Sequence, residues 1–328
     1  MTTLVLPFSI WTLQGPEADL LARAELPHWQ AWLTQAQRTQ VLPDAMPEPG
    51  RLAAFTPPHE RLLAQAQGWV QSDGCFPWAA RAAAAAGHDG HAAWAFISLC
   101  HWQVSNGQVT LGDPDDLQID PASNQALFDA MHGFFAEDGI ALHPYRNGVW
   151  LAQSPLFANL PTASLDRVIG RNIDPWLVDH PVLRRLQNEM QMLLYTHAVN
   201  EGRSQSINSF WLHGAGALPP TISAPPVAEI APSMAEIAPP CQVPDVASLK
   251  AMRRAALQND LYAWLHAWQA LDAELMQPLL HASERPTHWV LCGDQVAHVY
   301  RVAAPSMWQR MQQLFQPISL SQVIGVNP

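Results

Sequence analysis

The chain has 328 residues, of which 48% are hydrophobic and 14% are charged. It is long enough to bury a core and too apolar to be disordered as a whole. The 28 acidic residues outnumber the 17 basic ones, which gives a formal net charge of −11. This excludes non-specific nucleic-acid binding, because the chain has no cationic field to hold phosphates.

The sequence predicts a cytoplasmic protein. Residues 1–13 are apolar but contain no Lys or Arg and no small-residue cleavage site, which argues against a secretory signal. No window approaches 18 uninterrupted apolar residues, so no membrane span is expected. The cysteines at 75, 100, 241 and 292 form no C-x-x-C pair, so neither a zinc clip nor a disulfide framework is indicated.

Helical spacing of apolar residues predicts several helices before residue 200. They cover about 16–40, 57–71, 77–86, 123–136 and 181–199. Gly87 is placed to cap the third of them at its C-terminal end. Trp29 and Trp32 lie in the first, and each of the 14 tryptophans needs a large apolar surface, since it buries on the order of 200 Å². This pair, like Trp264 and Trp268, is therefore predicted to line contacts between a helix and the core.

Two hairpins are predicted beside these helices. The first joins strands at 93–104 and 108–111 through a turn at 105–107, and the second joins 140–143 to 148–153 around Asn147-Gly148. The acidic run between Asp113 and Asp120 lacks the glycine and the terminal glutamate of a calcium loop. It is predicted to be a turn whose aspartates cap helices.

A proline-rich segment at 218–245 separates the two predicted parts of the chain, because its prolines recur too often for a helix or a central strand. It contains the pentapeptide AEIAP twice and is interpreted as an exposed spacer, with a partner-binding motif as the alternative. Beyond it we expect a helix at 246–276, a hairpin at 287–301 turning at Gly293-Asp294, and a helix near 305–315. The expected fold class is α+β, with a main domain at 1–217, the linker at 218–245 and a C-terminal helix-hairpin-helix portion at 246–328 that packs on the main domain.

Common catalytic motifs are absent from the sequence. No P-loop surrounds Lys250, the only lysine, and the Gly214-Ala215-Gly216 segment fails the dinucleotide-binding fingerprint at its third glycine. His213 with the following glycines is similar to an esterase oxyanion motif, but the chain has no G-x-S-x-G. His88 and His91 are spaced as in some metal sites but lack a clear third ligand, so no metal is expected.

Polar residues that follow one apolar helical stripe form the candidate site. The helix end, a polar turn and a strand that runs into a glycine corner could gather these groups around a small anionic or amide-bearing ligand. The candidate ligand-binding residues are Asn188, Glu189, Gln191, His197, Asn200, Arg203, Asn208, Trp211, His213, Gly214 and Gly216.

A structural role for the same block is the alternative interpretation. In it the three asparagines satisfy buried backbone groups, Arg203 pairs with a carboxylate, and His197 caps the C-terminus of the helix.

A family resemblance rests on this same block, which reads LQNEMQM at 186–192 and NSFWLHGAG at 208–216. It resembles the proteobacterial RpfE-type regulatory proteins, which are often labelled as related to cofactor-independent phosphoglycerate mutase. Those mutases need a Ser or Thr nucleophile beside a metal-binding aspartate, and Asp and His clusters for two divalent metals. Ser9 has no neighbouring aspartate and Asp179-His180 lacks partners, so no catalytic residue carries over.

The leading hypothesis is a cytoplasmic regulatory protein of the RpfE type, without a cofactor, that binds a small anionic ligand or a protein partner. The alternative is an enzyme, metal-assisted or metal-independent, that acts on a phosphorylated small molecule. In that case Arg203 would hold the phosphate and His197 or His213 would transfer protons. A third hypothesis is a scaffold whose proline-rich tether docks a partner.

Overall fold

The computed structural model describes residues 3–12, 17–47, 50–219, 241–302 and 323–326. The chain forms two compact units. Unit 1 comprises Met1–Ala45, Pro57–Gly68 and Ser223–Pro328, and unit 2 comprises Met46–Thr56 and Trp69–Ile222. This division differs from the predicted domains, because the first strand of the chain pairs with a strand close to residue 290. Most of the predicted linker and the helix expected near 305–315 lie outside the described residues.

Unit 1 contains a five-stranded mixed sheet with the order β10-β1-β11-β12-β3. Strand β1 runs parallel to both of its neighbours, whereas β12 runs antiparallel to β11 and β3. A short parallel pair, β2 with β13, completes the described strands of this unit. The bounds are β1 (Thr3–Leu6), β2 (Trp11–Thr12), β3 (Ala36–Pro43), β10 (Cys241–Gln242), β11 (His288–Cys292), β12 (Val296–Val302) and β13 (Gly325–Val326).

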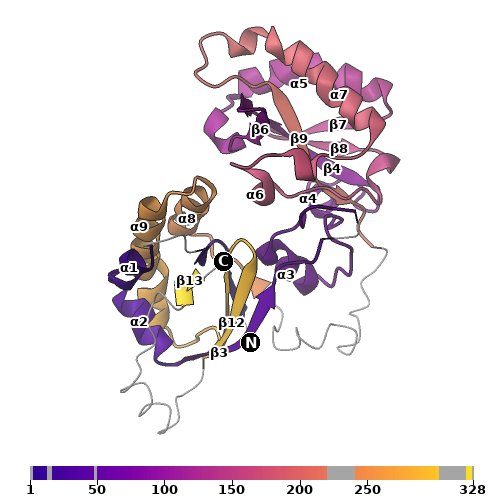
Figure 1. Ribbon diagram of the computed structural model, residues 1–328. Coiled ribbons are helices and arrows are strands. Elements are labelled where there is room, and N and C mark those ends of the chain that lie inside the picture. Colours follow the sequence, from indigo (N-terminus) through magenta and orange to yellow (C-terminus); the bar gives the residue numbers. More distant parts are fainter. Residues whose placement is uncertain (1–2, 13–16, 48–49, 220–240, 303–322, 327–328) are drawn as a thin grey trace. The chain divides into compact units, whose positions relative to one another are not determined.

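Helices lie on both faces of this sheet (Figure 1). Helix α3 covers one face, where Leu62 packs against Val290 and Val299. The other helices gather on the opposite face, where α2 packs its tryptophans against β11. The bounds are α1 (Glu17–Ala22), α2 (Pro27–Leu33), α3 (Pro58–Ala66), α8 (Ala247–Leu257), α9 (Leu261–Leu271) and α10 (Gln277–His281).

The start of α2 is held by a side chain from far along the sequence. Asp272 is 4% exposed, and its carboxylate accepts hydrogen bonds from the backbone amides of Trp29 (2.6 Å) and His28 (3.2 Å). It also contacts Nδ1 of His28 at 2.9 Å. Because the first amides of a helix have no partner within the helix, this carboxylate supplies the cap that Leu26 cannot.

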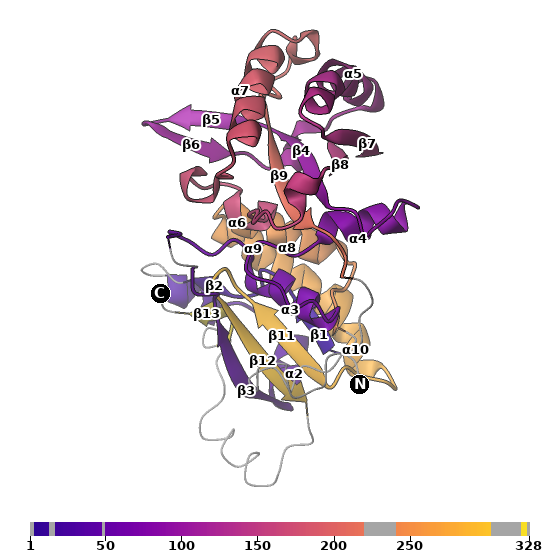
Figure 2. The same cartoon turned by 90° about the vertical axis from the view of Figure 1, so that its right-hand side faces the viewer.

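Unit 2 is built on a four-stranded antiparallel sheet with the order β7-β8-β4-β9. A separate hairpin of β5 and β6 extends away from it (Figure 2). Helices α5 and α7 cover one face over an aliphatic and aromatic core, and α4 packs its alanines on the other face. The bounds are α4 (Trp78–Ala85), β4 (Trp94–Cys100), β5 (Trp102–Ser105), β6 (Gln108–Leu111), α5 (Pro121–Glu137), β7 (Ala141–Arg146), β8 (Val149–Gln153), α6 (Leu165–Val168), α7 (Pro181–Tyr195) and β9 (Ser209–Gly216).

The α+β class and most of the local predictions for unit 2 are confirmed. Both hairpins form, Asp113 and Asp120 accept hydrogen bonds from the first amides of the helices that follow them, and Gly87 follows α4 with φ +89°. The hairpin expected at 287–301 is present as β11 and β12.

Two helix predictions in unit 1 are wrong. The helix expected over 16–40 is two short helices followed by strand β3, because residues 36–43 pair with β12. The helix expected over 246–276 is α8 and α9, which are separated at Asn259, a residue with φ +55°. A left-handed residue ends a helix, so the chain turns there.

Candidate ligand-binding site

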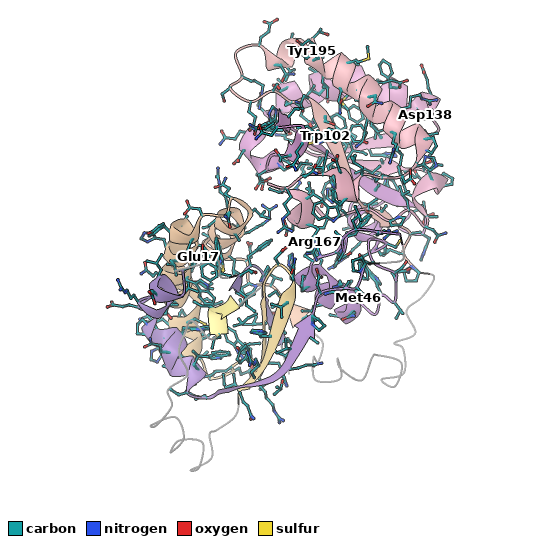
Figure 3. The ribbon with its side chains drawn as sticks, in the orientation of Figure 1. Glu17, Met46, Trp102, Asp138, Arg167 and Tyr195 are labelled. Atoms are coloured by element: carbon teal, nitrogen blue, oxygen red, sulfur yellow. The ribbon has the colours of Figure 1, made fainter. Side chains whose placement is uncertain are left out.

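The outward-facing part of the predicted polar block lies on α7. This helix buries Leu186 and Met190 as expected. Asn188 is exposed and bonds to no buried backbone group in the part of the chain that the structure describes, whereas Glu189 and Gln191 are partly exposed. Glu189 pairs with Arg185 (3.6 Å), which also binds Asp138. Asp138 lies near the start of α7, and the exposed Tyr195 marks its end (Figure 3).

The two asparagines beyond α7 bond to the backbone. Nδ2 of Asn200 donates to the carbonyls of Leu194 (2.8 Å) and Ile207 (2.9 Å), and its Oδ1 accepts from the Ile207 amide. Asn208 makes the same kind of pair with Trp102, through Oδ1 to its amide (2.7 Å) and Nδ2 to its carbonyl (2.9 Å). These side chains join the loop to its neighbours, so for them the structural interpretation is confirmed.

The structural interpretation is wrong in detail for His197 and Arg203. His197 does not cap the C-terminus of α7. Its Nδ1 accepts from the amide of Val199 at the start of a short 3₁₀ turn. The guanidinium of Arg203 donates to the carbonyls of Leu117 and Gln205 rather than to a carboxylate.

The remaining predicted residues lie on β9, whose side chains alternate between the two faces of the sheet. The indole nitrogen of Trp211 donates to the carbonyl of Ala163 (2.9 Å). Gly214 and Gly216 have φ +64° and +148°, and a Cβ atom at either would lie 3.0–3.2 Å from a side chain at the start of α4, Trp78 or Pro77. The glycines therefore permit close packing, and the predicted set is divided among α7, its following turn and β9 rather than arranged around one ligand.

A serine and a histidine meet on the α4 side of the unit 2 sheet. Oγ of Ser98 lies 2.9 Å from Nε2 of His213. Burial lowers the pKa of His213 to about 3, an effect that Arg146 reinforces and Asp166 opposes. A neutral histidine at this distance could activate a hydroxyl, but Ser98 is fully buried on the central strand β4. Its hydroxyl is out of reach of a substrate, so we interpret the pair as a structural hydrogen bond.

A pocket in unit 1 offers a better ligand site. It is shallow and mostly apolar, and it opens between the end of α2, the helix α10 and the strands β11 and β12. Its lining consists of Trp32, Gln35, Met276, Leu279, Leu280, Arg285, Pro286, Trp289 and Val302.

Stacked tryptophans form the inner wall of this pocket. The rings of Trp29 and Trp32 are stacked at 4.5 Å, and Trp32 lies 5.1 Å from Trp289. Trp32 is 4% exposed, and its indole Nε1 has no hydrogen-bond partner among the residues that the structure describes. A buried donor of this kind costs about 1–3 kcal/mol while it is unsatisfied.

The rim of the pocket carries a positive charge. Arg285 is exposed, and its Nε donates to the carbonyl of Ala282 at 3.2 Å, whereas its two terminal nitrogens donate to no acceptor among the described residues. This site was only partly predictable from the sequence. The i, i+3 spacing of Trp29 and Trp32 predicted a packed face, but the partners from residues 276–302 come from a distant part of the chain.

Comparisons with known proteins show distant structural likeness and no family. No family model matches the chain, and no curated protein matches it. Among solved structures, the cofactor-independent phosphoglycerate mutase from Thermoplasma acidophilum DSM 1728 is similar with a TM-score of 0.35 and 14% identity, over 93% of this chain and 90% of that one. A likeness at this level carries no argument about fold or reaction. The RpfE-type resemblance stays a prediction.

Hydropathy adds one finding. Among the described residues, no helix is both long enough and apolar enough to cross a membrane.

Proposed function

We propose that this protein is a regulatory protein that binds a small ligand in the tryptophan-lined pocket of unit 1. The ligand places a small apolar group in the pocket and an anionic group at its rim. The observation that carries the proposal is an apolar pocket lined by Trp32 and Trp289, with the exposed Arg285 at its rim.

Each part of the pocket matches a part of such a ligand. The faces and edges of Trp32 and Trp289 favour an aromatic or other flat apolar group. The terminal nitrogens of Arg285 donate to no acceptor among the described residues, so an anionic group would satisfy them. Filling the pocket would also remove apolar surface from water.

Catalysis is not part of the proposal. Ser98, which lies in hydrogen-bond contact with His213, is fully buried, and the groups that the sequence suggested for a phosphate-binding enzyme are bonded internally. Arg203 donates to two backbone carbonyls, and His197 accepts from the amide of Val199.

A fluorescent aromatic anion tests the proposal directly. Anilinonaphthalene sulfonate would be titrated into the full chain, with excitation of tryptophan and detection of energy transfer to the probe. We expect one saturable site that a non-fluorescent aryl carboxylate displaces. Arg285→Ala should weaken binding about 5- to 10-fold, because it removes a donor worth roughly 1 kcal/mol.

The matched control is Arg301→Ala, which removes another exposed arginine of unit 1 outside the pocket. It should bind as tightly as the unchanged protein, and Arg285→Lys should recover part of the affinity through charge alone. Equal binding by Arg285→Ala and by Arg301→Ala would show that the pocket does not hold the anion. A thermal-shift screen with phosphorylated metabolites, run on the unchanged protein and on Arg203→Ala, tests the enzyme alternative. Only that alternative predicts stabilisation by a phosphorylated compound that is lost when Arg203 is replaced.

A further inference from the structure

Three aromatic rings from separate segments of unit 2 meet at one edge of its sheet. His88 follows the end of α4, Trp94 begins β4, and His143 lies on the edge strand β7. The ring centroids of His88 and His143 are 4.9 Å apart, and each lies 5.2 Å from Trp94.

The position of His88 is fixed by the way α4 ends. His88 lies three residues beyond Ala85, the last residue of α4. Its amide donates to the carbonyl of Ala83 (2.9 Å), and Gly87 takes the left-handed conformation that allows this. The indole nitrogen of Trp94 donates to the carbonyl of Asp89 (2.8 Å), so the next residue of the loop is also tied down. His143 is fixed by its pairing with Leu151 in β8.

One ring nitrogen in this group lacks a partner. Nε2 of His143 is buried and makes no hydrogen bond to any residue that the structure describes. An imidazole nitrogen without a hydrogen-bond partner is available to bind a metal ion.

We propose that His88 and His143 bind one divalent transition-metal ion, of which Zn²⁺ is the representative. With metal–nitrogen bonds of about 2.0–2.1 Å, two imidazoles on one tetrahedral or octahedral ion have centroids roughly 4.5–5.2 Å apart. The observed separation of 4.9 Å lies in that interval. Imidazole nitrogen suits Zn²⁺, Ni²⁺ and Cu²⁺ and discriminates against Ca²⁺ and Mg²⁺, which prefer oxygen.

The other histidine of the same loop is not part of this site. His91 is exposed, and its Nδ1 lies 3.3 Å from the carbonyl of Leu218. The sequence analysis expected no metal at His88-Asp89-Gly90-His91, and the second ligand proposed here comes from β7, more than 50 residues further along the chain. With two protein ligands, the remaining coordination positions are open to water or to an anion.

Zinc titration of the full-length protein by isothermal calorimetry tests the site. His88→Phe and His143→Phe keep an aromatic ring against Trp94 but remove the ligand nitrogens. Each should weaken the tightest Zn²⁺ site at least 10-fold, whereas His91→Ala should change it less than twofold. Circular dichroism and thermal melting would establish that the variants are folded, and His88→Gln or His143→Gln would replace a Phe variant that is not.

The quenching of tryptophan fluorescence by Cu²⁺ gives a second readout, because Trp94 lies against both rings. It should be strong in the unchanged protein and weaker in both Phe variants. The proposal is overturned if the unchanged protein binds no Zn²⁺ at 0.1 mM, or if both Phe variants bind it as tightly as the unchanged protein does. It is equally overturned if His91→Ala loses as much affinity as they do.

Discussion

The two units treat their buried tryptophans differently. In unit 2, the fully buried Trp94 and Trp150 donate their indole N–H to the carbonyl of Asp89 and to Oδ1 of Asn124. In unit 1, Trp29 and Trp268 are equally buried, but neither indole nitrogen has a partner in the described part of the chain. These two rings lie 4.9 Å apart and contact further tryptophans.

This difference separates two ways of building a core. The fully buried indoles of unit 2, Trp94, Trp150 and Trp211, each donate to an acceptor. In unit 1, Trp264 and Trp289 do the same, whereas Trp29 and Trp268 leave their donors unsatisfied and pack against other aromatic rings. Such aromatic pairs contribute about 0.5–1.5 kcal/mol each beyond burial.

The largest expected effect comes from the clamp on α2. Asp272→Ala leaves the amides of His28 and Trp29 without their acceptor, so it should destabilise the protein by about 3 kcal/mol, because hydrogen bonds to a buried charged group are the strong ones. The counterpart in unit 2 is the neutral clamp Asn200, and Asn200→Ala should cost about 1–2 kcal/mol.

Urea denaturation measures the loss of unfolding free energy in Asp272→Ala and Asn200→Ala. Amide hydrogen exchange shows which elements of the protein are destabilised in each variant. Exchange should accelerate in α2 for the first variant and in β9 for the second. Equal costs would show that the charge on Asp272 adds nothing to its hydrogen bonds.

The tryptophans themselves provide the second test. Trp150→Phe breaks a hydrogen bond to Asn124 (3.0 Å) and should cost about 2 kcal/mol, since burial is lost as well. Trp29→Phe loses a similar area but removes an unsatisfied donor, so its cost should be below about 1 kcal/mol. Chemical denaturation of the two variants measures the difference. If Trp29→Phe is the more costly of the two, stacking rather than hydrogen bonding governs both cores.

The same contrast explains what could be predicted from the sequence. In unit 2, the strand pairs β5 with β6 and β7 with β8 are adjacent along the chain, so alternation, Asn-Gly turns and aspartate caps predicted both hairpins and α5 correctly. In unit 1, β1 pairs with strands more than 230 residues away, and no local pattern encodes such pairing. Strand β3 is an edge strand with mostly exposed residues, so its sequence lacked the apolar alternation of a strand.

The candidate site was harder to predict than the fold, for a related reason. Polar residues such as Asn200 and Asn208 look alike in sequence whether they bind a ligand or a backbone carbonyl, and only the structure shows the second. The pocket around Trp32 and the pair of His88 with His143 each combine segments that are 55 or more residues apart, so spacing within one segment could not reveal them.

Acidification should weaken both units through one buried histidine each. The pKa of His213 in unit 2 is lowered to about 3, and that of His298 in unit 1 to about 4, in both cases mainly by burial. The unfolded chain takes up these protons below about pH 6.5, whereas the folded protein does not. Stability should therefore fall as the pH drops below 6.5, by about 1–2 kcal/mol for each histidine between pH 7 and pH 5.

Denaturation at several pH values checks this for the unchanged protein, His213→Gln and His298→Gln. Each variant should show a flatter dependence on pH than the unchanged protein, while His281→Gln, which changes an exposed histidine, should not. An unchanged slope in His213→Gln would mean that water reaches this ring in the folded state.

The smallest effect is a gain of stability confined to unit 2. Gly133 lies in the middle of α5 with open space where a Cβ atom would be, so Gly133→Ala should stabilise the protein by about 0.5–1 kcal/mol through helix propensity. Gly139 also has open space but sits at φ +69°, so Gly139→Ala should destabilise by about 1 kcal/mol and serves as the matched control. Hydrogen exchange should slow in α5 and β8 of Gly133→Ala and stay unchanged in α9 and β11. Slower exchange in both sets of elements would show that the two units share one unfolding transition. The costs of Trp29→Phe and Trp150→Phe would then both be changes in the unfolding free energy of the whole protein.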